Sequence, residues 1–320
     1  MKKLFILALT LLSLSATAQK KPALVVGIVV DQMRYEYLYK YFDRYSDKGF
    51  KRLMREGINC TDNHYNYAPT VTAAGHASIY TGSVPAIHGI VENDWIDVAS
   101  GKKVYCVDDS TVKTVGSNSK AGKMSPRNLF TSTLTDQLKI AQNYKSKTIA
   151  ISLKDRGSII PGGHTADASY WYDSADGYWI TSSFYMNELP TWVQKFNQEG
   201  RPQKYLNQGW NTLYPISTYT RSAEDNSAYE GKLGNEKTPT FPHALKGDNM
   251  LEVFRKTPYG NNLVKEFALK AIEEEKLGKN GTTDFLAISF SSTDYVGHAF
   301  GPQSIEIEDT YLRLDQDMAE

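Results

Sequence analysis

The sequence has no net charge and few cysteines, and beyond its N-terminus it has no long apolar run. Its 36 Lys and Arg residues balance its 36 Asp and Glu residues, so no overall basicity favours binding to nucleic acid or anionic lipid. Outside the N-terminal segment, no stretch approaches the roughly 18 apolar residues that a membrane-spanning helix needs. A composition of 41% hydrophobic and 22% charged residues excludes a disordered or collagen-like chain.

The N-terminus has the pattern of a secretory signal peptide. Lys2 and Lys3 precede an apolar run over 4–14, and Ala-Thr-Ala at 16–18 fits a cleavage site. The apolar run is too short to span a bilayer easily, which disfavours a membrane anchor. We therefore predict that residues 1–18 are removed and that the protein is periplasmic or secreted, with no stable membrane anchor.

The two cysteines, Cys60 and Cys106, both lie in the part that would be exported. No CxxC motif occurs, which argues against a metal site made of cysteines alone. An oxidising compartment permits a disulfide between the two residues, and this is the pairing we expect. Two unpaired thiols are the alternative.

Short apolar runs alternate with helical patterns along most of the chain. The run ALVVGIVV at 23–30 is rich in β-branched residues and predicts a central strand buried on both faces. Further strands are expected at 58–67, 148–152 and 284–290, and helices at 50–56, 72–81, 125–139 and 263–275. This alternation predicts an α/β fold with a doubly wound, mostly parallel sheet. Residues 161–245 are rich in Gly, Pro, Tyr and Trp and predict an inserted cap between two core segments, 19–160 and 246–320.

Charged residues follow three of the expected strands. Asp31 ends the first, Lys154 and Arg156 follow the second, and Asp294 follows the third with His298 four residues later. Open α/β sheets bind ligands beyond the carboxyl ends of their strands, so these groups should meet at one edge. Asp294 and His298 would share a helix face and suit one metal ion, although such a pair is also common on surfaces.

Thr72 stands where the chain enters an expected helix. A hydroxyl there faces the positive end of the helix dipole, which suits a nucleophile. An ordinary N-cap threonine is the alternative, and Thr70 is the rival for either role.

Several stretches of the chain together resemble the alkaline phosphatase superfamily. They are GIVVDQMR at 27–34, PTVTAAGHASIYTGSVPAIHGI at 69–90, Asn93-Asp94, SLKDRG at 152–157 and STDYVGHAFGP at 292–302. Within the superfamily they are most similar to the nucleotide pyrophosphatase/phosphodiesterase branch and its PafA-type alkaline phosphatases. The joint occurrence of these stretches is far more specific than any one of them.

The resemblance implies a hydrolase that uses two zinc ions. It makes Asp31 and Thr72 ligands of one zinc, Thr72 also the nucleophile that forms a phospho-threonine intermediate, and Asp294 and His298 ligands of the other. It makes Asn93, Lys154 and Arg156 contacts of the phosphate. A phosphate monoester is a dianion, so the cationic pair on one loop favours small monoester substrates. A phosphodiesterase or nucleotide pyrophosphatase of the same superfamily is the first alternative, and a non-catalytic exported protein on a degenerate phosphatase fold is the second.

The metal site that the resemblance implies is incomplete in this sequence. A dinuclear zinc site needs about three protein ligands per metal, and the family takes the remainder from a later Asp-His pair and a later His. No histidine follows His298. We therefore expect the remaining ligands beyond Glu320 and little activity from these residues alone. The alternative is a short variant that uses His164 or His243 as a ligand.

Overall fold

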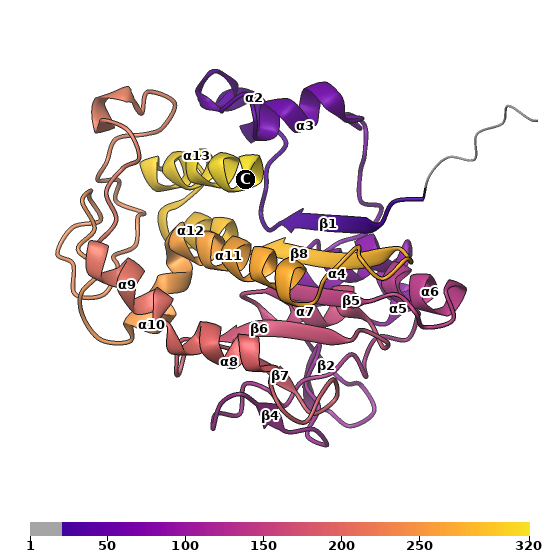
Figure 1. The fold of residues 1–320 in the computed structure, drawn as a ribbon. Helices are drawn as coiled ribbons and strands as arrows, with labels where there is room; N and C mark the ends of the chain where they lie inside the picture. Colours follow the sequence, from indigo (N-terminus) through magenta and orange to yellow (C-terminus); the bar gives the residue numbers. More distant parts are fainter. Residues whose placement is uncertain (1–20) are drawn as a thin grey trace, which may run out of the picture.

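The computed structural model describes residues 21–320, so the predicted signal peptide at 1–18 lies outside the described residues. A six-stranded sheet in the order β1-β8-β5-β6-β7-β4 forms the centre of the molecule (Figure 1). The first four strands of that order are parallel, and β7 and β4 are antiparallel to their neighbours. The strands are β1 (Leu24–Val30), β4 (Thr114–Val115), β5 (Thr148–Ser152), β6 (Ala168–Asp173), β7 (Tyr178–Ser182) and β8 (Asp284–Phe290). The predicted α/β fold with a mostly parallel sheet is confirmed.

Helices cover both faces of this sheet. In β5 and β8 every residue is buried, and successive side chains point to opposite faces. Ile149 and Ile151 pack in the cluster that contains the apolar side of one long helix, whereas Ala150 packs with Tyr80 on the other face. The helices are α2 (Tyr37–Lys40), α3 (Phe50–Glu56), α4 (Thr72–Thr81), α5 (Pro85–His88), α6 (Leu134–Ala141), α7 (Asp155–Gly162), α8 (Thr191–Gln198), α9 (Arg201–Gln208), α10 (Met250–Val253), α11 (Tyr259–Glu274), α12 (Ser292–Phe300) and α13 (Ile305–Ala319). No helix among residues 21–320 combines the length and the apolar character needed to cross a bilayer.

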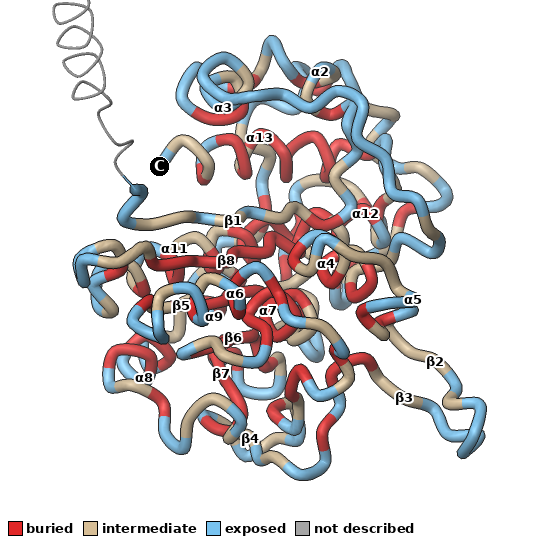
Figure 2. Tube along the Cα trace, turned by 90° about the vertical axis from the view of Figure 1, so that its right-hand side faces the viewer, coloured by how far each residue is buried: buried red, intermediate tan, exposed pale blue. Residues whose placement is uncertain are grey.

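Strand β1 lies at an edge of the described sheet, so the prediction that it is central was wrong. Among the described strands it pairs with β8 alone. Val26 and Ile28 are 43% and 45% exposed, whereas β5 and β8 lie within the buried centre (Figure 2). An apolar β-branched run indicates a strand, but its place in the sheet depends on which neighbours pair with it.

The predicted insert at 161–245 does not begin where composition placed it. Strands β6 and β7 belong to the main sheet, and Trp171 and Trp179 pack in its core. Their aromatic and hydroxyl side chains obscured the strand pattern. Residues 183–245 do depart from the sheet and contain α8, α9 and irregular segments.

Two local predictions also differ from the structure. Residues 58–67 form no strand. The helix expected from Ser125 begins at Leu134 instead, because Thr133 and Asp136 form a reciprocal capping box there. The Ser125 hydroxyl donates to Asp109 at 2.6 Å and accepts the Arg127 N–H at 3.3 Å, but no helix begins there.

The predicted disulfide between Cys60 and Cys106 is not formed. Cys60 is exposed in the segment after α3, and Cys106 is buried at the end of a small hairpin. The Cys106 side chain packs with Ala73 and Val107, so its sulfur is enclosed by a different part of the core.

The apolar stripe of α13 finds its partner near the start of the chain. Ile307, Tyr311 and Leu314 are buried, and the ring centroids of Tyr311 and Tyr37 lie 4.7 Å apart. The α2 region therefore covers the apolar face of α13.

His243 is enclosed between two carboxylates beside the C-terminal helix. Its Nδ1 lies 3.0 Å from Glu236 and its Nε2 lies 3.2 Å from Glu306, so both nitrogens donate. Burial disfavours the charged ring, but the two carboxylates outweigh this and raise the pKa of His243 to about 9. The ring is therefore an imidazolium at neutral pH.

This ion pair should make stability depend on pH. The folded-state pKa lies above the ordinary value of 6.5, so the stabilisation is complete below about pH 6.5 and is lost as the pH rises through about 9. At about 1.4 kcal/mol per pKa unit, the total is on the order of 3 kcal/mol. Urea unfolding between about pH 7 and pH 10 should show a steeper loss for the wild type than for His243→Gln. Equal slopes for the two proteins would contradict the assignment.

Candidate functional site

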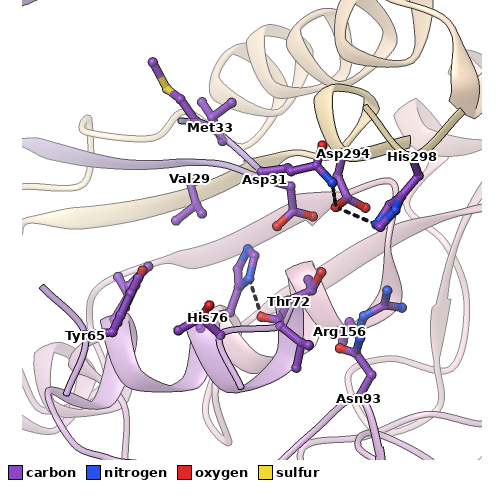
Figure 3. A pocket seen from close by; sticks show the side chains of 16 residues that line it. Val29, Asp31, Met33, Tyr65, Thr72, His76, Asn93, Arg156, Asp294 and His298 are labelled. Atoms are coloured by element: carbon purple, nitrogen blue, oxygen red, sulfur yellow. Dashed lines mark hydrogen bonds and ion pairs between the residues drawn. The ribbon is translucent and has the colours of Figure 1, made fainter. Parts of the chain in front are cut away.

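Residues that follow three parallel strands meet at one edge of the sheet, as predicted. Asp31 follows β1, Asp294 and His298 lie on α12 after β8, and Arg156 lies on α7 after β5. Together with Thr72, they line a cavity of about 460 Å³, which Asn93 also borders (Figure 3). Because β1, β8 and β5 are adjacent and parallel, their carboxyl ends face the same space.

Lys154 occupies the centre of the polar cluster. Its ammonium donates to Asp294 Oδ2 at 2.6 Å and to Asp31 Oδ2 at 2.8 Å. The Lys154 side chain is 1% exposed. Burial raises the pKa of Asp31, but Lys154, His76 and Arg156 outweigh this and lower it overall. Two carboxylates thus gather around one buried cation.

Thr72 presents its hydroxyl to the same cation. Lys154 Nζ donates to Thr72 Oγ1 at 3.1 Å. Thr72 is the first residue of α4, and the N-cap position belongs to Val71. Its hydroxyl makes no capping bond, so the interpretation of Thr72 as an ordinary N-cap was wrong. Thr70, the rival residue, also lines the cavity.

Asn93 is joined to the beginning of the same helix. Its side-chain oxygen accepts a hydrogen bond from the Ala73 N–H at 3.0 Å. Because the oxygen is used in this way, the amide NH₂ group is the donor that Asn93 can offer to a ligand. Asn93 and Arg156 line the same cavity.

His76 links the first turn of α4 to the sheet by hydrogen bonds. Its Nδ1–H donates to the Thr72 carbonyl at 2.8 Å, and the Ser289 hydroxyl donates to Nε2 at 2.9 Å. Burial lowers the pKa of His76 despite the attraction of Asp31, which agrees with this neutral tautomer. His76 therefore has both ring nitrogens hydrogen-bonded within the core.

Asp294 and His298 share a face of α12, as their spacing predicted. The His298 Nε2 lies 3.3 Å from Asp294 Oδ1, and the imidazole is 73% exposed. Gln32 donates to the same oxygen of Asp294 at 3.2 Å, a contact that sequence reasoning missed. The sequence signal for this contact was the position of Gln32 directly after Asp31.

Tyr105 is a second residue that sequence reasoning missed. Its hydroxyl lies 3.0 Å from Arg156 Nη1 and 2.5 Å from Asp155 Oδ1. Tyr105 ends β3 (Lys103–Tyr105), which pairs with β2 (Asp94–Ile96) directly after Asn93. No sequence pattern relates this hairpin to the Arg156 loop.

The two histidines considered as alternative ligands lie elsewhere. His164 contacts Asp136 and the Leu129 carbonyl, and His243 is held by Glu236 and Glu306. Within residues 21–320, no group of three or more His, Cys, Asp or Glu side chains is arranged to hold a metal ion.

The buried cation should contribute strongly to stability. Removing Lys154 leaves two carboxylates facing each other without a counter-charge, which typically costs about 3–5 kcal/mol. We expect Lys154→Met to lower the free energy of unfolding of the metal-free protein by that order, measured by urea denaturation. Lys270, which pairs with Glu274 on the surface, provides the control, because Lys270→Met should cost less than about 1 kcal/mol. Equal effects of the two substitutions would contradict the central role of Lys154.

The comparisons with known proteins agree with this arrangement. The family model described as type I phosphodiesterase / nucleotide pyrophosphatase matches residues 25–320. Alkaline phosphatase PhoV of Synechococcus elongatus is 55% identical over 300 residues, which cover 93% of this chain and 54% of PhoV. Alkaline phosphatase PafA of Elizabethkingia meningoseptica is 52% identical over 307 residues, covering 95% of this chain and 56% of PafA.

A solved structure is also similar over nearly the whole chain. It is a crystal structure of a PafA variant substituted at one threonine, one asparagine, one lysine and one arginine, in that order along its sequence. The TM-score is 0.92 at 50% identity, and the match covers 95% of this chain and 59% of that one. The chain thus spans slightly more than half the length of the relatives that it matches. The chain is similar over most of its length to the PafA and PhoV alkaline phosphatases, and it belongs to the type I phosphodiesterase / nucleotide pyrophosphatase family.

Proposed function

We propose that this chain carries the nucleophile and the phosphate contacts of an exported, zinc-dependent alkaline phosphatase that hydrolyses small phosphate monoesters. The observation that carries the proposal is the convergence of Thr72, Asp31 and Asp294 on the Lys154 ammonium. Export to the periplasm or medium is supported by the signal-peptide pattern at 1–18.

The donor groups at the site fit zinc in their chemistry. Carboxylate oxygen, hydroxyl oxygen and imidazole nitrogen are ligands that zinc accepts, and two carboxylates already surround one buried cation. Asp31 and Thr72 would hold one zinc, and Asp294 and His298 would contribute to a second. Bound zinc would stabilise negative charge on the attacking and leaving oxygens.

Thr72 is the proposed nucleophile. Its hydroxyl oxygen lies in the first turn of α4, where the helix dipole favours negative charge. The Lys154 ammonium at 3.1 Å favours the alkoxide further. The Thr72 oxygen forms a bond to phosphorus as the ester oxygen leaves, which gives a phospho-threonine. Water then attacks the same phosphorus, releasing inorganic phosphate and restoring the hydroxyl.

Asn93, Lys154 and Arg156 are the proposed contacts of the phosphoryl oxygens. A monoester dianion has three non-bridging oxygens and needs several donors, preferably charged ones. The PafA variant with substitutions at a threonine, an asparagine, a lysine and an arginine supports this assignment. Thr72, Asn93, Lys154 and Arg156 are the same residue types in the same order.

A phosphodiesterase is the second candidate, because the matching family model carries that description. A diester has one negative charge and a second ester group, so it needs fewer cationic partners and an apolar slot. The presence of Lys154 and Arg156 near the nucleophile favours the monoester.

The two candidates are separated by comparing p-nitrophenyl phosphate with bis-p-nitrophenyl phosphate in the full-length, zinc-loaded protein. We expect the monoester to be the better substrate and Arg156→Ala to reduce its kcat/KM by roughly 10²–10³-fold. The same substitution should affect the diester much less, and Thr72→Ala should abolish turnover of both. Faster diester cleavage, or an unchanged monoester rate in Arg156→Ala, would reject the monoesterase. No hydrolysis of either ester would favour a non-catalytic protein.

A further inference from the structure

A set of hydrogen-bonded side chains joins Arg156, a proposed phosphate contact, to the β2–β3 hairpin, which lies earlier in the chain. We propose that Tyr105 is a positioning residue that holds the Arg156 guanidinium in place for a phosphoryl group. This inference rests on the proposed function, because it assigns a cause for the placement of one of its substrate contacts.

The direction of each hydrogen bond follows from the number of protons available. The Tyr105 hydroxyl has one proton, and an ionised Asp155 can only accept, so the 2.5 Å contact is donated by Tyr105. The tyrosine oxygen is then oriented to accept from Arg156 Nη1 at 3.0 Å. Burial, together with the negative charge of Asp155, raises the pKa of Tyr105, so the hydroxyl keeps its proton. The carboxylate therefore sets the orientation in which tyrosine meets arginine.

Asp155 is itself fixed at the beginning of α7. The same Oδ1 atom accepts the Arg156 backbone N–H at 2.6 Å. A rotation of the Tyr105 hydroxyl away from Arg156 would break its bond to this anchored oxygen. Tyr105, Asp155 and Arg156 thus form one hydrogen-bonded unit.

Tyr105 occupies one donor of Arg156 and leaves the others available. The guanidinium is planar and carries five N–H donors in a rigid fork, so a bond at one end fixes the plane of the whole group. Arg156 Nε is buried without a hydrogen-bond partner, and the described part of the chain supplies no hydrogen-bond acceptor for Nη2. Arg156 lines the same cavity as Asn93 and Thr72 (Figure 3). A phosphoryl group at that position would meet the unused donors.

The hairpin relates Arg156 to Asn93 as well. Tyr105 pairs with Asp94 across β2 and β3, and the Cys106 N–H donates to the Asn93 carbonyl at 2.9 Å. The tip of the hairpin projects from the body of the molecule, whereas the end that carries these residues is packed against it (Figure 2). The β2–β3 hairpin therefore positions both Asn93 and Tyr105, the hydrogen-bond partner of Arg156.

The test uses the full-length, zinc-loaded protein with Tyr105→Phe, which removes the hydroxyl and keeps the ring. We expect kcat/KM for p-nitrophenyl phosphate to fall roughly tenfold, as for the loss of one hydrogen bond to a charged group. The fall for bis-p-nitrophenyl phosphate should be smaller, because that ester depends less on Arg156. Tyr205→Phe is the matched control, because the hydroxyl of Tyr205, on α9, donates to Glu266, on α11, at 2.6 Å. It should change kcat/KM less than about twofold.

A double-mutant cycle separates positioning from a general structural effect. If Tyr105 acts through Arg156, then Tyr105→Phe should cost less than about twofold when Arg156 is already alanine. Asp155→Ala should lower monoester turnover in the same direction and should not add to Tyr105→Phe. This second variant also serves if Tyr105→Phe folds poorly. The inhibition constant of inorganic phosphate should weaken in parallel with kcat/KM.

The outcomes distinguish a failure of the role of Tyr105 from a failure of the proposed function. If the wild type hydrolyses monoesters and Tyr105→Phe matches Tyr205→Phe, the role of Tyr105 is rejected and the proposed function stands. Additive losses in the cycle would also reject it. If the wild type neither hydrolyses monoesters nor binds phosphate, the proposed function fails and the role of Tyr105 fails with it.

Discussion

The arrangement at the sheet edge depends on one buried ammonium between two carboxylates. Lys154 contacts Asp31, which follows β1, and Asp294, which lies on α12 after β8, and it also donates to the Thr72 hydroxyl. Burying carboxylates is unfavourable unless a cation compensates them. The cluster therefore persists only if all of these side chains arrive at the same place. This single requirement brings two carboxylates, a threonine hydroxyl and a cation together at one place.

The sheet supplies that meeting point. Strands β1, β8 and β5 are adjacent and parallel, and each ends next to a polar side chain or the helix that carries one. Helices on both faces bury β5 and β8 completely, so both strands are held by packing on either side. Thr72, the proposed nucleophile, lies at the start of α4, one of those helices. His76 joins the first turn of α4 to Ser289 near the end of β8. The packing that stabilises the core therefore also positions the side chains of the site.

The proposed phosphate contacts are held in place by a different set of interactions. Asn93 and Tyr105 belong to a hairpin outside the main sheet, and Arg156 belongs to α7. Hydrogen bonds among Tyr105, Asp155 and Arg156 join these two elements. Asn93 meanwhile bonds to the N–H of Ala73, next to Thr72. The side of the site that carries Asn93 and Arg156 is therefore fixed by polar bonds between segments, whereas the sheet edge that carries Asp31 and Asp294 is fixed by strand packing.

The sequence alone was sufficient for the features that are local. Apolar runs indicated β1, β5 and β8, spacing placed Asp294 and His298 on one helix face, and joint motifs indicated the family. Only the tertiary structure decided that β1 lies at the edge of the sheet formed by the described residues, that Cys60 and Cys106 stay apart, and that Lys154 lies between Asp31 and Asp294. It alone also brought Tyr105 to Arg156. Local periodicity records which side of an element is buried, whereas these contacts depend on packing between segments far apart in the chain, which no short pattern encodes.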